Sequence, residues 1–409
     1  MTAGQTSAQP AAVGCADCGL VQVVSPPARG CILECARCGN SLRRFAYGGV
    51  EPPLAFAAAA LMLLWPAMLA PMMSVGSFGT ERSSWLPSGT EALWHEGFIS
   101  LASIVGLCSV AIPFIYLALL VFVLAGVRFG STLPLGRLFR WAGWLRPWAM
   151  IEVYLVGCCV AYTRLQDVGT VRVDMGGWCL LAATSAALLA TLTLDEATIW
   201  NALPVGIEPV RSRRTLTCDT CGLVLEAERE HARCPRCEAR LHQRKPESLE
   251  RTLALVVAGF LLYLPANLLP VLSIERFGRV EPNTILSGVR ELIAADLWPL
   301  AAVVFSASIL VPLMKLSGLS LMLLLTHRRS SRWLLGRTYL YRIIEFIGRW
   351  SSIDLFMISI LVALVQFGNL TRVRPQAGAV AFAAVVVVTM LASRCFDPRI
   401  MWDATDGAA

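Results

Sequence analysis

The chain alternates between long apolar runs and shorter polar segments that are rich in cysteine or arginine. In the first half, three runs carry no charged residue, at 52–80, 97–127 and 175–194, and a fourth, at 147–163, carries only Glu152. A helix that crosses a hydrocarbon core about 30 Å thick needs roughly 20 residues. These runs therefore predict four membrane-spanning helices.

The second half repeats this pattern. Its apolar runs lie at 252–274, 297–326, 350–371 and 375–393. The second of them contains Lys315 and the third contains Asp354. Prolines and tryptophans recur at nearly constant spacing between the halves, as in the pairs Pro66 and Pro265, Pro71 and Pro270, and Trp148 and Trp350. Apolar composition alone does not produce such matches, so the sequence predicts an internal duplication.

Each repeat begins with four cysteines in two pairs, each pair spaced Cys-x2-Cys. The pairs are Cys15 and Cys18 with Cys35 and Cys38, and Cys218 and Cys221 with Cys234 and Cys237. Four thiolates at this spacing hold one tetrahedral Zn²⁺ and leave no open position for catalysis. We therefore predict two structural zinc ribbons, each with one Zn²⁺. Cys31 lies close enough to Cys35 to be either a competing ligand or a spare thiol.

The predicted fold is an all-α polytopic membrane protein with two tandem repeats, each a small four-cysteine zinc ribbon followed by four transmembrane helices. The segments are a disordered tail (1–14), a first ribbon (15–44), a first membrane unit (52–194), a linker (195–217), a second ribbon (218–242), a second membrane unit (252–393) and a C-terminal tail (394–409). Composition agrees, because 15% of residues are charged, whereas soluble domains average roughly 25%.

The net charge of +7 is concentrated in two connecting segments. Residues 127–146 carry four arginines and no acid, and residues 327–349 carry six arginines and one glutamate. Basic connections stay in the cytoplasm, and four spans per repeat give both repeats the same orientation. Both ribbons and both termini are therefore expected in the cytoplasm, where cysteines stay reduced. The arginines thus indicate topology, and no nucleic-acid partner is expected.

No enzymatic motif accompanies these features. The chain has four histidines and neither a phosphate-binding glycine loop of Walker type nor a nucleophile elbow. We therefore expect no catalytic activity.

Charged residues inside the predicted spans mark candidate pathway residues, because a charge in hydrocarbon is costly and usually faces the protein interior. They are Glu152, Lys315 and Asp354. Lys315 and Asp354 are expected to line a polar cavity that opens on the face opposite the ribbons. The alternative for Glu152 and Asp354 is that each lies near an interfacial tryptophan and reaches the headgroups.

The first span of each repeat is interrupted by prolines. A proline inside a helix removes a backbone hydrogen bond, so Pro265 and Pro270 predict a kink or break, with Asn267 placed between them to satisfy a freed carbonyl. This break is either a cavity wall on the transport pathway or a structural kink.

The segments Leu264-Pro265-Ala266-Asn267-Leu268-Leu269-Pro270 and Trp350-Ser351-Ser352-Ile353-Asp354, set in two tandem ribbon-and-membrane units, resemble the paraquat-inducible protein A family. The resemblance covers nearly the whole chain. It implies a bacterial inner-membrane protein that works with a periplasmic MCE-domain partner and passes phospholipids between the inner and outer membranes. Met68 and Tyr116 stand where Asn267 and Lys315 stand in the second repeat, so lipid handling is expected in that repeat.

Two other functions fit the same residues. One is a zinc-stabilised scaffold or stress sensor that recruits cytoplasmic partners through its ribbons. The other is a small-molecule or proton-coupled exporter that uses Lys315 and Asp354.

Overall fold

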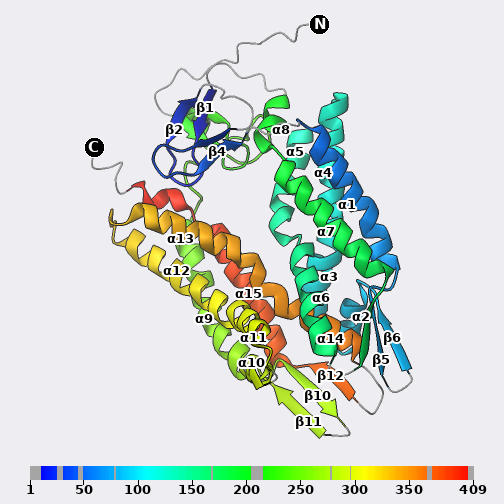
Figure 1. Ribbon diagram of the computed structural model, residues 1–409. Helices are drawn as coiled ribbons and strands as arrows, with labels where there is room; N and C mark the ends of the chain where they lie inside the picture. Colours follow the sequence, from blue (N-terminus) through cyan, green and yellow to red (C-terminus); the bar gives the residue numbers. More distant parts are fainter. Residues whose placement is uncertain are drawn as a thin grey trace.

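A computed structural model describes residues 11–24, 31–44, 49–77, 80–166, 169–203, 215–276, 279–294, 296–365 and 371–403. Two helical units lie side by side, with the cysteine-rich segments at one end and small sheets at the other (Figure 1). In the described part of the chain, eight helical segments are long and apolar enough to cross a membrane. They are Glu51–Leu69, Ile99–Phe129, Leu135–Thr163, Met175–Thr193, Ser248–Leu268, Ala301–His327, Leu334–Leu364 and Ala377–Cys395.

The elements of the first unit follow one another in this order: α1 (Glu51–Leu69), β5 (Met73–Ser77), β6 (Thr80–Ser84), α2 (Ser88–His95), α3 (Ile99–Gly106), the π-helix η1 (Leu107–Ala111), α4 (Ile112–Phe129), α5 (Leu135–Leu145), η2 (Arg146–Trp148), α6 (Ile151–Leu165), β7 (Thr170–Val173), α7 (Met175–Thr193) and α8 (Glu196–Ala202). Strand β5 pairs antiparallel with both β6 and β7.

The second unit repeats this order: α9 (Ser248–Leu268), β10 (Leu272–Arg276), β11 (Arg279–Asn283), α10 (Ile285–Ala294), α11 (Trp298–Phe305), the π-helix η4 (Ser306–Leu310), α12 (Val311–His327), α13 (Leu334–Ile347), η5 (Gly348–Ser352), α14 (Ile353–Leu364), β12 (Thr371–Pro375), α15 (Ala377–Cys395) and η6 (Pro398–Met401). Its sheet has the same topology, with β10 between β11 and β12.

The first apolar run of each repeat is not one helix, in contrast to the expectation from its length. Helix α1 ends at Leu69, before Pro71, and the rest of the run forms β5. Helix α9 ends at Leu268, before Pro270, and is followed by β10. Proline lacks the amide that would continue the helix. The proline motif therefore ends the helix and starts the sheet.

The last helix of each unit begins against this proline turn. The amides of Gly176 and Gly378 donate to the carbonyls of Pro71 and Pro270, at 2.9 and 3.0 Å. A side chain on either glycine would collide with the turn backbone. The close approach lets α7 pack along α1 and α15 along α9.

The two arginine-rich connections, predicted as loops, are largely helical. Helix α5 lies within the first and α13 within the second. Arg337, predicted to contribute to the exposed basic loop, is fully buried in α13. Its guanidinium donates to the Ser330 carbonyl and the Thr326 hydroxyl, both at 2.9 Å, and so holds the turn between α12 and α13.

The tail and linker boundaries also differ from the prediction. Residues 11–14 of the predicted tail form the strand β1 (Ala11–Gly14), which pairs with β2 (Val21–Val24) in the first ribbon. The predicted linker begins with α8 and ends with β8 (Thr215–Thr217), which pairs with β9 (Val224–Glu226) in the second ribbon. The strands β3 (Ile32–Glu34) and β4 (Ser41–Arg44) complete the first ribbon.

The two units meet through their third spans. Helix α14 packs on α6 and on α2 of the first unit. The rings of Tyr154 and Phe356 meet edge to face, with 5.5 Å between their centroids. A side chain on Gly157 would press on Phe356, with 3.1 Å between the two Cβ atoms. Helix α14 therefore belongs to the core of both units.

Candidate functional site

The eight paired cysteines form two compact buried clusters. In each, the four sulfur atoms lie within 4.8 Å of one another. Two Sγ–Sγ contacts in each cluster measure 3.5 to 3.6 Å, close to the roughly 3.8 Å expected around a tetrahedral zinc with 2.3 Å bonds. Hydrogen bonds from the Cys18 and Cys38 thiols lower the pKa of Cys15, and the same contacts raise the pKa of Cys18 and Cys38, so Cys15 ionises first. The geometry is suited to one metal ion per cluster.

Tight turns place these sulfurs. The amides of Gly19, Gly39 and Gly222 each donate to the carbonyl of the first cysteine of their pair, and all three glycines have positive φ. In the fourth turn Glu238 takes this conformation, with φ of 57°. Cys31 is exposed and lies outside the cluster of four. The geometry thus assigns Cys31 no ligand role.

The first ribbon packs on the second membrane unit. Asp17 pairs with Arg342 of α13 at 2.7 Å, and Arg37 lies over the Trp402 ring, 4.7 Å from its centroid. The cysteines of this ribbon share a hydrophobic cluster with Tyr341 and Phe396.

The second ribbon packs on the first membrane unit. Its cysteines share a hydrophobic cluster with Phe139 and Trp200. A side chain on Gly136 of α5 would overlap the carbonyl oxygen of Arg236 in this ribbon. Each ribbon is therefore docked mainly on the membrane unit of the other repeat, and Figure 1 shows both at the same end of the molecule.

A buried acid connects the second ribbon to the C-terminal segment. Asp397 accepts hydrogen bonds from Arg399 and from the Lys245 amide, and Arg399 also pairs with Asp219 of the ribbon at 2.7 Å. Burial opposes ionisation of Asp397, but the hydrogen bonds and charge of Arg399 outweigh it and lower the pKa of Asp397. Burial raises the pKa of Asp219, against the opposing charge of Arg399.

Three neighbouring spaces that share lining residues lie between the units at the ribbon end. A chamber of about 870 Å³ is lined by Arg140, Trp144, Trp200 and Arg394, among others. A cavity of about 320 Å³ leads from Arg146 and Arg394 to Lys315. A slot of about 290 Å³ lies between α4, α6 and α7. Arg146 lines all three spaces, which together form the inter-unit cavity.

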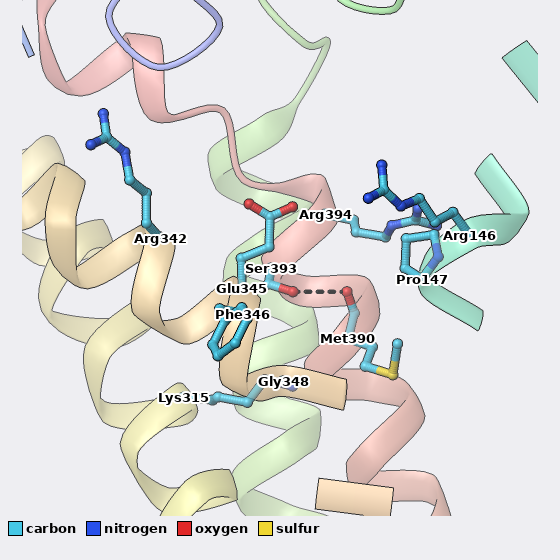
Figure 2. Close-up of a pocket in the computed structure, with 10 residues that line it drawn as sticks. All are labelled: Arg146, Pro147, Lys315, Arg342, Glu345, Phe346, Gly348, Met390, Ser393 and Arg394. Atoms are coloured by element: carbon cyan, nitrogen blue, oxygen red, sulfur yellow. Dashed lines mark hydrogen bonds between the residues drawn. The ribbon is translucent and has the colours of Figure 1, made fainter. Parts of the chain in front are cut away.

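Lys315 lies at the inner end of this cavity (Figure 2). Its side chain is 1% exposed, and its ammonium donates to the Thr389 hydroxyl of α15 at 3.0 Å. The cavity contains Arg342 and Arg394, which lie near the ribbons. It therefore leads toward the ribbons, whereas the sequence suggested an opening on the opposite face. Asp354 is the second residue of α14, but its side chain lies outside the described residues.

The matched residue Tyr116 lies in the same cavity system, lining the chamber and the slot. Both residues follow a π-helix and a proline: Pro113 precedes Tyr116, and Pro312 precedes Lys315. In the two π-helices, Ser109 and Ser308 donate to carbonyls one turn back, both at 2.7 Å. π-Helices within α-helices are frequent at functional sites.

Glu152 lies in the first turn of α6 and lines the slot, opposite Phe346 and Trp350 of the second unit. Pro265, Asn267 and Pro270 lie at the opposite end of the molecule from the ribbons, where α9 meets its sheet (Figure 1). The Asn267 amide donates to the Tyr263 carbonyl at 2.9 Å. The sequence predicts a bond to a carbonyl that the proline leaves free, which for Pro265 is that of Leu261; the Asn267 side chain instead bonds the carbonyl four residues before its own position.

Sequence reasoning missed three residues of the site. Thr389 lies in an uncharged run, where a single hydroxyl gives no signal. Arg146 and Arg394 lie at the ends of membrane helices, where an arginine is expected from the topology alone and so does not indicate a site. Only the folded chain brings Arg146 of η2 close to Arg394 of α15 (Figure 2).

Comparisons with known proteins identify the family. The family model "Paraquat-inducible protein A" matches residues 50–204 and 249–406, which are the two membrane units with their flanks. No solved structure matches the chain.

Curated relatives match nearly the full length. The chain is 31% identical over 400 residues to "Intermembrane transport protein PqiA" of Escherichia coli K12, covering 95% of both chains. It is 30% identical over 376 residues to "Lipophilic envelope-spanning tunnel protein A" of the same strain, covering 90% of this chain and 86% of that one. It is 27% identical over 383 residues to "Probable intermembrane transport protein" of Haemophilus influenzae, covering 91% of both. With two ribbon-and-membrane repeats and these matches, the chain belongs to the paraquat-inducible protein A family.

Proposed function

We propose that this chain is the inner-membrane component of an intermembrane phospholipid transport system and works with a periplasmic MCE-domain protein. The observation that carries the proposal is the inter-unit cavity, which joins a cationic, tryptophan-lined chamber to an apolar slot. An amphipathic space of this kind suits a phospholipid. The names of the relatives, two of which refer to intermembrane transport and one to an envelope-spanning tunnel, support the same function.

In this proposal each ribbon holds one structural Zn²⁺. All four ligand residues of each cluster are buried cysteines, a set that suits zinc. Four sulfur ligands fill a tetrahedral site and leave no position for a reacting water. Cys15, Cys18, Cys35 and Cys38 would hold one ion, and Cys218, Cys221, Cys234 and Cys237 the other. The metal stabilises ribbons that are too small to fold on a hydrophobic core alone.

The pathway residues of the proposal are Lys315 and Asp354, with Glu152 at the slot and the Pro265–Asn267–Pro270 turn at the far end of α9. Lys315 is neutralised by no ion pair among the described residues and is held by Thr389. An ammonium buried in this way suits interaction with an anionic headgroup or a proton-carrying carboxyl.

Orientation follows from the basic helices α5 and α13 at the ribbon end. We place the ribbons and both termini in the cytoplasm and the two three-stranded sheets in the periplasm, where an MCE-domain partner would meet them. A reporter that is active only in the periplasm should be silent when fused after Trp402, and active in the β10–β11 hairpin. The reverse result would overturn the orientation.

The proposed function is tested by pulse-labelling phospholipids in the host and measuring their exchange between the two membranes. Deletion of this chain, or of an MCE-domain protein encoded beside it, should slow exchange to the same extent. Unchanged exchange in both deletions would contradict the proposal. A scaffold role would instead leave exchange intact and alter the recruitment of cytoplasmic proteins to the membrane.

A further inference from the structure

We infer that the inter-unit cavity binds an anionic phospholipid of the leaflet at the ribbon end, with its phosphate between Arg146 and Arg394 and an acyl chain in the slot. The inference rests on the proposed function and deepens it, because it assigns the headgroup class and the leaflet. It concerns the end of the cavity near Arg146 and Arg394, whereas Lys315 lies at the inner end.

The phosphate position follows from two arginines that come from different units. Arg146 begins η2 of the first unit, and Arg394 lies in the last turn of α15 of the second. The Arg394 guanidinium already crosses the interface, since it donates to the Trp144 carbonyl at 3.2 Å. Arg146 pairs with Glu196 at 2.8 Å and stays 40% exposed, so it retains donors for a second anion. A guanidinium has five donors in a planar fork that matches a phosphate.

The charge of the lining favours an anionic headgroup. Six of the described lining residues are lysine or arginine, and four are aspartate or glutamate. Two lining residues are paired with residues outside the cavity: Asp219 with Arg399, and Arg342 with Asp17. One pair neutralises a negative lining charge and the other a positive one, so together they leave the net charge of the lining unchanged. The remaining positive excess attracts a phosphate whose headgroup carries no compensating amine.

The acyl position follows from the slot. Apart from Arg146, Glu152 and Thr191, its walls are aliphatic or aromatic, with Leu117 from α4, Ala187 and Leu188 from α7, and Phe346 from α13. Arg146 and Tyr116 line both the slot and the chamber, so a molecule can reach from one to the other. A free phosphate or a soluble phosphate ester would leave this slot unfilled, which is the reason for assigning a lipid.

The depth of the site matches a membrane interface. Trp141 and Trp144 of α5 are about half exposed beside the chamber. Tryptophans of this kind gather at the headgroup level of membrane proteins. The phosphate between the arginines would therefore lie level with the headgroups of the adjacent leaflet, and a lipid could enter without leaving the bilayer.

The inference is tested on the full-length, zinc-loaded protein purified in a mild detergent. The protein is equilibrated with mixed micelles of phosphatidylglycerol and phosphatidylcholine in equal amounts, washed, and extracted for lipid analysis by mass spectrometry. We expect retained phosphatidylglycerol to exceed phosphatidylcholine. Arg146→Gln and Arg394→Gln should each reduce that preference about fivefold, the effect of one basic residue near an anionic lipid.

Arg332→Gln is the matched control, because Arg332 is exposed in the turn at the same end and lines none of these spaces. Its preference should equal that of the unaltered protein. Equal losses in Arg332→Gln and the two site variants would show a general surface effect and overturn the site. Equal retention of both lipids by the unaltered protein would also overturn it.

Ala187→Phe provides a second test that leaves every charge in place. The larger side chain fills the slot and should reduce retained lipid of both classes, with zinc content unchanged. Retention unaffected by Ala187→Phe would contradict the acyl assignment. Displacement of phosphatidylglycerol by millimolar inorganic phosphate or glycerol phosphate would identify a free-anion site and overturn the lipid assignment.

Failure of the lipid site and failure of the proposed transport function give different results. Selective retention without lipid exchange between membranes would support the site and contradict the transport role. Normal exchange in a protein with no selective retention would support transport and overturn the site.

Discussion

The two membrane units have the same order of elements but different polar chemistry. Tyr116 and Lys315 occupy matched positions after a proline and a π-helix. Lys315 is buried and bound to Thr389, whereas Tyr116 faces the chamber and slot. After duplication, one scaffold therefore came to place a buried cation in one unit and a neutral phenol in the other. The matched positions therefore differ in charge, although the first unit also contributes Arg140 and Arg146 to the chamber.

The two ribbons differ in what they touch. The first contacts Arg342 of α13 and Trp402, and the second contacts Gly136 of α5 and Arg399 of the C-terminal segment. Each ribbon therefore contacts the membrane unit of the other repeat. Five predictions test these differences, in order of decreasing expected effect.

Cys234→Ser tests whether the ribbons are independent metal sites. We expect bound zinc to fall from two to one per chain, since a structural zinc contributes roughly 10–16 kcal/mol to the folding of a small domain. The second ribbon should become sensitive to protease while the membrane helices remain inserted. Metal analysis and limited proteolysis measure this. Cys31→Ser is the control and should retain both ions; a loss of zinc there would make Cys31 a ligand.

Lys315→Ala and Tyr116→Phe test the chemical difference between the units. Lys315→Ala should reduce lipid exchange at least tenfold, because it removes the buried ammonium and its bond to Thr389 together with the packed aliphatic stem. Tyr116→Phe should be mild, and Glu152→Gln intermediate; Asp354→Ala should resemble Lys315→Ala. Exchange is measured in cells with protein levels checked by immunoblot. Full activity of an abundant Lys315→Ala variant would remove the lysine from the pathway.

Asp397→Asn and Asp195→Asn compare matched acids at the ends of the repeats. Asp195 caps α8 by accepting hydrogen bonds from the Ala197 and Thr198 amides. Asparagine also caps helices, so Asp195→Asn should lower the free energy of unfolding by less than about 1 kcal/mol. Asp397 is paired with Arg399 in a buried site, and removing such a partner costs about 3–5 kcal/mol. Protease resistance of the ribbon end under denaturant titration measures both. Equal costs would show that the Arg399 pair is not important for docking.

The same pair predicts a pH dependence. Because the folded-state pKa of Asp397 is lowered, its contribution to stability is present above the ordinary aspartate pKa and is lost as pH falls through the lowered value. Docking of the C-terminal segment should therefore weaken only in acid, below about pH 4. Asp397→Asn should flatten this decline. The same decline in both proteins would assign it to other carboxylates.

Gly136→Ala and Gly143→Ala compare two glycines of α5. An alanine at 136 overlaps the Arg236 carbonyl of the second ribbon, so we expect a loss of about 1–3 kcal/mol in ribbon docking. An alanine at 143 meets nothing within 4 Å and should stabilise the helix by about 0.5–1 kcal/mol. Thermal unfolding of the purified protein measures both. A neutral Gly136→Ala would show that the second ribbon is not packed tightly on α5.

The features predicted from sequence are those set by local composition. Cysteine spacing identified the clusters, and apolar length identified the eight spans. The sheets were missed because β5 and β10 continue an apolar run after a proline and pair with strands far along the chain. The chamber was missed because Arg146 and Arg394 approach each other only after the two units pack. Their sequence neighbourhoods indicate two ordinary helix ends.

The docking of the first ribbon has a consequence for the order of assembly during synthesis. Asp17 and Arg342 are 325 positions apart, and Trp402, under Arg37, is made later still. At about 5–20 residues per second, the first ribbon emerges on the order of tens of seconds before its binding surface exists. The ribbon must therefore keep its four cysteines together without that surface until the last helix is inserted. Docking of the first ribbon is then a late step, which can occur only after Arg342 and Trp402 have been synthesised.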